Sequence, residues 1–224
     1  MRKQQYNQKL TLKKAAEGIL IAIENSKSLL ADANLLYDNE RYERATALAI
    51  LAIEENGKPK ILREILLEDD QKKLKAKWQE YRRHTEKNNS WIVPELISKG
   101  ARHLYEMQHL FDEKSPHRQE LDYLKQLAFY TEAFSKCEWS NPKNVINKET
   151  AEYIISIATV SIKHQNIFVS EKELEIWYKH MKPVWNENGN VVIKALINCM
   201  KEAEDFGYIA KGYTEKAIKF YTSV

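Results

Sequence analysis

A nine-residue stretch without a charged side chain, Ala45–Ile53, constrains the fold of this chain more than any other feature of its sequence. If the stretch is helical, apolar side chains point outward in every direction around the helix axis, and no side of the helix suits water. Other elements must therefore surround it, because burying apolar surface is the main driving force for folding. We expect Ala45–Ile53 to form part of a buried central helix.

The scarcity of turn residues favours the all-α class. The 224-residue chain contains six glycines and five prolines, whereas average usage would give about 27 of the two together. An all-β sandwich or barrel needs more turns than this. The hydrophobic pattern predicts about eight helices, near 12–37, 41–67, 71–89, 94–111, 115–134, 148–164, 170–185 and 190–205. Gly57 and Pro59 predict a kink in the second of them.

The sequence also argues against several classes of protein and site. Its two cysteines are too few for a disulfide framework or a structural zinc site, and it contains no glycine-rich phosphate-binding loop. No apolar run approaches the roughly 20 residues that span a membrane, and the first twenty residues do not resemble a signal peptide. We therefore predict a cytoplasmic protein with no cofactor, no metal and no membrane contact.

Two acids and a lysine follow the apolar stretch and form the first candidate site. Lys58 lies three or four residues after Glu55 and Glu54, which is the spacing of helical ion pairs. Glu55 lies seven residues after Leu48 and continues an inward-facing row, and a carboxylate that enters a core needs a partner. Lys58 can supply it for either acid. The alternative is that these residues end the apolar stretch and pair at the surface.

The second candidate site is a basic helix. Residues 71–87 hold seven Lys/Arg and two acids, in a chain whose net charge is +3. One helix stripe consists of Lys73, Lys77, Glu80, His84 and Lys87. Like charge nearby favours the neutral form of His84, which could act as a general base on a ribose 2′-hydroxyl while Arg83 and the lysines hold phosphate. The alternative is a solvated basic face.

A third pattern is an arginine, Arg102, followed after six intervening residues by His109. It matches the loose Arg–spacer–His pattern of metal-independent helical ribonucleases. The two residues lie two helical turns apart, so they would meet only across a symmetric dimer interface. The alternative is chance, because a chain with many arginines produces such a pattern easily.

Several segments together resemble the AbiV-type abortive-infection proteins, which are bacterial phage-defence factors. Ala45–Lys58 is similar to the signature helix of that family, and His84–Lys87 is similar to its H-x-x-K element. Lys125–Tyr130 followed by Trp139–Pro142 resembles its later element, a short helix end before a W-x-x-P loop. The resemblance covers roughly residues 12–165.

This resemblance implies a helical fold related to the HEPN domains, which often dimerise and in many members cut RNA. It also implies that the protein halts phage multiplication, at protein synthesis, after a phage product triggers it. We accordingly expect a HEPN-like helical domain over 1–165 and a helical extension packed on it over 166–224. A homodimer is expected.

Two hypotheses on function follow. In the first, the protein acts on RNA or translation as a metal-independent ribonuclease, with a catalytic set of Glu55, His84 and Lys87 and a binding set of Glu54, Lys58, Arg83, Lys73 and Lys77. In the second, the protein is a non-catalytic helical module that binds a phage protein or the translation machinery, and the same polar cluster is structural.

Overall fold

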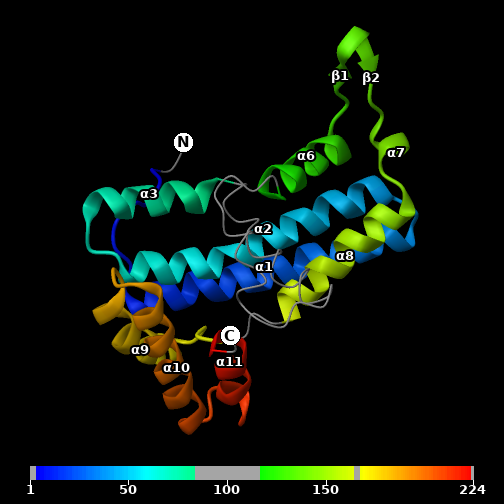
Figure 1. Cartoon of the computed structure of the whole chain (residues 1–224). Helices are drawn as coiled ribbons and strands as arrows, with labels where there is room; N and C mark the ends of the chain where they lie inside the picture. The colour runs from blue at the N-terminus through cyan, green and yellow to red at the C-terminus, as the bar shows by residue number, and fades with distance from the viewer. Residues whose placement is uncertain (1–3, 84–116, 164–166, 223–224) are drawn as a thin grey trace.

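A computed structural model describes residues 4–83, 117–163 and 167–222, and these residues form an all-α protein (Figure 1). Its helices are α1 (Leu12–Asp38), α2 (Tyr42–Leu67), α3 (Gln71–Arg82), α6 (His117–Phe129), α7 (Pro142–Val145), α8 (Lys148–Lys163), α9 (Glu171–Met181), α10 (Gly189–Asp205) and α11 (Tyr213–Thr222). The all-α prediction is confirmed. The helix predicted at 94–111 lies outside the described residues.

The long helices α1 and α2 form the centre of the molecule and run side by side in opposite directions (Figure 1). Thr11 caps α1, because its hydroxyl accepts a hydrogen bond from the Lys14 N–H at 3.2 Å. The buried side of α1 is rich in alanine, with Ala15, Ala22 and Ala33 almost fully enclosed. Small side chains there let the two helix axes approach closely.

Helix α2 is the buried central helix that its apolar stretch predicts. Ala47, Ile50 and Ile53 have no exposed surface, and α2 packs against α1, α3, α6 and α8. The helix continues through Pro59 to Leu67 without a break, as expected. The kink at that point stays a prediction.

Two large apolar clusters lie in the interior of the described residues, beside a smaller one formed by Ala47, Ala128 and Ile146. The first, here called the shared core, begins at Ala15 of α1, includes Leu62 of α2 and Trp78 of α3, and ends with Cys199 of α10 and Ile209 beyond it. The second core lies at the other end of α2 and joins it to α6 and α8 through buried aliphatic side chains, among them Ile50, Ile53, Leu121, Ile154 and Ile157.

Polar contacts also join the C-terminal helices to α2. The Arg63 guanidinium donates to the Phe168 carbonyl at 3.4 Å, and the Trp185 indole donates to Glu68 at 3.1 Å. Lys182 forms an ion pair with Asp69. Helices α9 and α10 therefore pack at one end of the α1–α2 pair, and α11 packs against α10 (Figure 1). The division into units at residue 165 stays a prediction.

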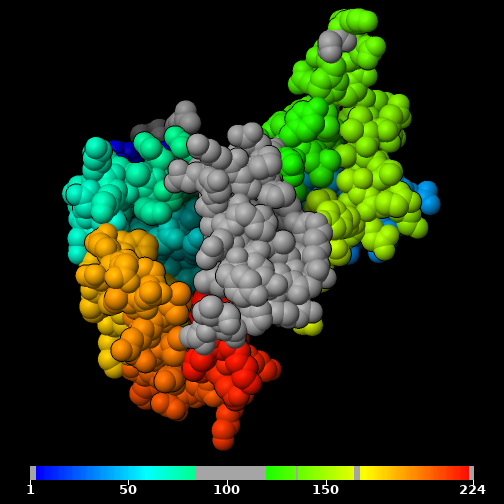
Figure 2. Space-filling view, viewed as in Figure 1, coloured from blue at the N-terminus to red at the C-terminus, as the bar shows by residue number. Residues whose placement is uncertain are grey.

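The segment after α6 differs from its predicted form. The sequence predicts a helix near 115–134, but α6 ends at Phe129. A small hairpin follows, in which β1 (Ala133–Phe134) pairs with β2 (Glu138–Trp139). Ser140 closes its base by donating to the Glu132 carbonyl at 2.7 Å and accepting from the Glu132 N–H at 2.9 Å. The hairpin projects from the helical body (Figures 1 and 2).

Candidate functional site

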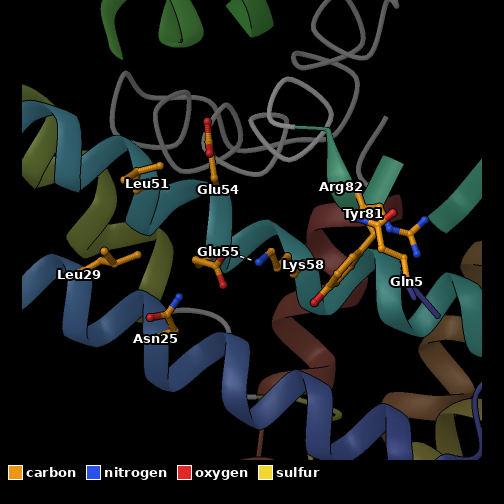
Figure 3. A pocket seen from close by; sticks show the side chains of 9 residues that line it. All are labelled: Gln5, Asn25, Leu29, Leu51, Glu54, Glu55, Lys58, Tyr81 and Arg82. Atoms are coloured by element: carbon orange, nitrogen blue, oxygen red, sulfur yellow. Dashed lines mark ion pairs between the residues drawn. The ribbon is translucent and has the colours of Figure 1, made fainter. Parts of the chain in front are cut away.

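A pocket of about 520 Å³ lies between α1, α2 and α3 (Figure 3). All three helices and the segment before α1 contribute side chains to its wall, which are Gln5, Asn25, Leu29, Leu51, Glu54, Glu55, Lys58, Tyr81 and Arg82. The pocket therefore joins the acid–lysine cluster of α2 to the end of the basic helix α3. The sequence proposed these two features as parts of one site.

Glu55 and Lys58 form an ion pair along α2, drawn as a dashed line in Figure 3. Both side chains are less than one-fifth exposed. The Lys58 ammonium also lies 5.3 Å from the centre of the Tyr81 ring, where a cation is attracted by the face of the aromatic ring. Lys58 thus links α2 to α3 across the pocket.

The end of α3 is fixed by Trp78. Its indole donates to the Gln8 carbonyl at 2.9 Å, and its ring packs edge-on against Tyr81 at 5.4 Å between ring centres. Arg82 lies over the same indole and donates to the carbonyls of Trp78 and Tyr6. The α3 wall of the pocket is therefore anchored both in the shared core and on the N-terminal segment.

Glu54 leaves α2 in a different direction from Glu55 (Figure 3) and enters the protein interior. It is 2% exposed and pairs with Lys125 of α6, which is 5% exposed, at 2.6 Å between Nζ and Oε1. Lys125 also pairs with Asp122 at 2.9 Å. Burial alone would lower the pKa of Lys125, but hydrogen bonds to the two carboxylates outweigh it and raise the pKa above its usual value.

The structure thus divides the predicted cluster into two ion pairs. Lys58 pairs with Glu55, whereas Glu54 pairs with Lys125, 71 residues away in sequence. Glu54 rather than Glu55 is the carboxylate that enters the core. The spacing of residues along α2 could not identify Lys125 as a partner of Glu54. Lys125 is nevertheless the first residue of Lys125–Tyr130, one of the segments that resemble the family.

The remaining predicted binding residues lie on or beside α3. Lys77 is three-quarters buried and pairs with Glu64 at 2.8 Å and Glu80 at 2.9 Å. Burial opposes its charge, but these carboxylates outweigh burial and raise its pKa. Lys73 donates to the Asn186 side chain at 3.3 Å, and Arg83 ends the helix with an exposed side chain.

Four other predicted residues are His84, Lys87, Arg102 and His109. All four lie outside the described residues. Arg82, in the pocket wall, is only two residues before His84 in the chain. The shared site that the sequence proposes therefore stays a prediction.

The described wall combines groups with distinct chemistry. Glu55 can accept a hydrogen bond from a hydroxyl group, whereas Lys58, Tyr81 and Arg82 can donate to an anionic oxygen. No three His, Cys, Asp or Glu side chains within the described ranges gather closely enough to hold a metal ion. The wall as described is suited to a polar, anionic ligand.

Comparisons with known proteins identify one family. A family model described as AbiV, of the HEPN type, matches residues 14–163, which include α1, α2, α3, α6, the hairpin and α8. No curated protein and no solved structure matches the chain. Among the helices that the structure describes, none has the length and apolar character to cross a membrane.

Proposed function

The chain belongs to the AbiV family, and from this membership we propose that it is a bacterial anti-phage protein of the abortive-infection type, which halts phage multiplication by acting on RNA or translation. Membership of the family points to phage defence. The step from defence to RNA rests on the pocket and on the basic helix beside it. We also propose that the protein is a cytoplasmic homodimer.

One observation carries the proposal: the pocket brings Glu55 and Lys58 of α2 to the end of α3. The chain leaves the pocket wall at Arg82 and reaches His84 and Lys87 within five residues. An extended residue spans at most about 3.6 Å, so both side chains start within roughly 18 Å of Arg82. This closeness supports a single site with Glu55, His84 and Lys87 as its reacting groups.

The proposed reaction is cleavage of RNA by its own 2′-hydroxyl. His84 takes the proton from that hydroxyl, the oxygen attacks the adjacent phosphorus, and the bond to the next 5′-oxygen breaks as that oxygen takes up a proton from water. The hydroxide left by that water takes the proton back from His84, which returns the imidazole to its neutral form. Lys87 stabilises the charge that develops on the phosphoryl oxygens, Arg83 binds the RNA backbone, and Glu55 orients Lys58. The products are a 2′,3′-cyclic phosphate and a 5′-hydroxyl, and no metal ion takes part.

Sequencing of RNA ends tests this reaction in cells. In phage-infected cells that express the protein, we expect new RNA ends that carry 2′,3′-cyclic phosphates, and we expect His84→Ala to remove them together with protection. His84→Ala should keep the wild-type melting temperature. Protection by the wild type without new ends would contradict the nuclease proposal.

A second candidate function is supported by the projecting hairpin. Its Trp139 is 72% exposed, and Phe134 and the neighbouring Tyr130 are also exposed. Exposed aromatic side chains are typical of the residues that dominate binding energy in protein interfaces. A non-catalytic module that binds a phage protein or the translation machinery would use this surface.

The two functions predict opposite results for the variant Trp139→Ala. For an RNA-directed enzyme whose site is the pocket, we expect this variant to protect cells as well as the wild type and to melt at the same temperature, because the ring faces solvent. A plaque assay with matched expression measures this. Loss of protection at unchanged melting temperature would favour the binding module.

A further inference from the structure

Helix α3 carries five cationic side chains and a single acid, Glu80. The structure shows that part of this charge is already used within the protein. Lys77 is neutralised by Glu64 and Glu80, and Arg82 is bound to backbone carbonyls and to the Trp78 ring. Glu80, the single acid of α3, is therefore already paired with Lys77 and does not balance the cations on the outward face.

Three cationic side chains on that outward face remain available. Lys72, Lys75 and Arg83 are exposed, and none has an ion-pair partner among the residues that the structure describes. With Gln79 they fall at helical spacings of three and four residues, so they share one face. We call Lys72, Lys75, Gln79 and Arg83 the outer stripe. From Lys72 to Arg83 it extends for roughly 16 Å along α3, and α3 lies at the periphery of the molecule (Figures 1 and 2).

An exposed aromatic ring lies beside this charge. Tyr6 is 53% exposed and rests edge-on against Trp78, with 5.7 Å between the ring centres. Arg82 holds the Tyr6 backbone in place through its carbonyl. Trp78 and Arg82 adjoin Lys75 around the helix, so the ring borders the outer stripe.

We infer that the outer stripe binds the phosphates of single-stranded RNA while Tyr6 stacks on one of its bases. This inference rests on the proposed function, and it names the surface on which the RNA substrate binds. Single-stranded nucleic acids are bound by cationic side chains that follow the backbone together with aromatic rings that stack on bases. Ordinary protein surfaces intersperse charges of both signs, whereas the described residues offer no ion-pair partner to the three cations of the outer stripe.

An acidic protein partner would meet the same charges, but the composition of the stripe favours RNA. Lysine is depleted in protein–protein interfaces because its hydrated ammonium is costly to bury. Two of the three cations are lysines with solvent-exposed side chains. Contact with phosphates, in contrast, displaces counterions and requires little burial of the ammonium groups.

The salt dependence of RNA binding tests the inference. Fluorescence anisotropy of the full-length protein with a labelled 20-nucleotide single-stranded RNA gives Kd between 50 and 200 mM KCl. In the triple variant Lys72→Gln, Lys75→Gln and Arg83→Gln, we expect Kd at 50 mM to rise tenfold or more. The slope of log Kd against log salt should fall by about 2, because each contact on single strands contributes about 0.7.

Two further variants separate charge from stacking. The control triple Lys27→Gln, Lys143→Gln and Lys163→Gln removes the same charge at exposed positions away from α3, and its Kd and slope should equal those of the wild type. Tyr6→Leu keeps an apolar contact with Trp78 but loses the ring, so Kd should rise at least fivefold with an unchanged slope.

Three outcomes would overturn the inference: no RNA binding by the wild type, an equal loss in the control triple, or polyglutamate binding as tight as RNA binding. The last would assign the stripe to an acidic protein. The nuclease reaction is tested separately, because each of these three outcomes is compatible with new RNA ends that depend on His84 in infected cells. Absence of those ends, with salt-dependent RNA binding intact, would overturn the nuclease reaction and leave the docking surface in place.

Discussion

Lys125→Met is expected to lower the free energy of unfolding by about 3–5 kcal/mol, because it removes the ammonium group that pairs with the buried Glu54 carboxylate at 2.6 Å. For a domain of this length the melting temperature should fall by roughly 10 °C. Asp122, the other partner, is about one-third exposed and can turn to water. Thermal and denaturant unfolding, followed by circular dichroism, measure both quantities.

A matched pair of variants isolates the buried charge as the cause. The double variant Glu54→Leu and Lys125→Met removes both charges and should recover most of the loss, since replacing a whole buried ion pair by apolar residues is often nearly neutral. Lys143→Met, at an exposed position, should melt like the wild type. If Lys125→Met itself unfolds like the wild type, the pair contributes nothing to stability.

The same pair predicts a pH dependence. The folded pKa of Lys125 is raised above the value of about 10.4 for an unfolded chain. Its contribution to stability is therefore complete below the unfolded pKa and is lost as pH rises through the folded pKa. Above pH 10 the wild type should lose stability more steeply than the apolar double variant. Parallel pH profiles of the two proteins would contradict this.

Glu55→Gln is expected to abolish phage protection, so that the efficiency of plating returns to that of cells without the protein. The variant leaves Lys58 on the Tyr81 face but removes the carboxylate that orients it. An ion pair of this partly exposed kind contributes at most about 1 kcal/mol, so the melting temperature should change by only about 2–4 °C.

Two controls distinguish a functional carboxylate from a structural ion pair. Lys14 and Glu17 form a pair with the same three-residue spacing, but both side chains are more than half exposed, and Glu17→Gln should protect fully. The exchange Glu55→Lys with Lys58→Glu keeps a pair in α2 but reverses its polarity, and it should not restore protection. Protection by this exchanged variant would mean that the pair only holds the helix.

The sequence was sufficient to place α2 in the interior. Burial of a helix depends on how apolar residues are distributed around its axis, and Ala45–Ile53 displays that distribution directly. The apolar side of α3 follows the same rule, and its Leu74 and Trp78 are buried. Membership of a helical family was likewise visible in short segments of sequence and is confirmed.

The pairing of charges could not be read in the same way. Which lysine meets Glu54 depends on how α6 packs against α2, and the sequence between them contains many lysines at no distinctive spacing. Lys77 illustrates the same limit, because Glu64, which neutralises it, belongs to the neighbouring helix. A lysine that appears unpaired when only its own helix is considered can form an ion pair with an acid on a neighbouring helix.

The hairpin was not predicted, because its local sequence lacks the usual signals of strands and turns. Its strands are two residues long, too short for any alternation of apolar and polar residues to be recognised. Its turn places Lys136 and Cys137 in the left-handed region, at φ of +64° and +62°, where glycine or asparagine is the usual signal. Because the turn contains neither glycine nor asparagine at these positions, the sequence does not indicate it.

The composition of the two cores has a consequence for the order in which the protein is completed during synthesis. The buried residues of the second core all precede residue 159, so that core can assemble while the chain is still growing. The shared core includes residues from Ala15 to Ile209, so its packing can be completed only after Ile209 has left the ribosome. Trp78, which fixes the α3 wall of the pocket, belongs to this late core. We therefore expect a chain that ends before Ile209 to lack the packing that holds Trp78, and with it the complete α3 wall of the pocket.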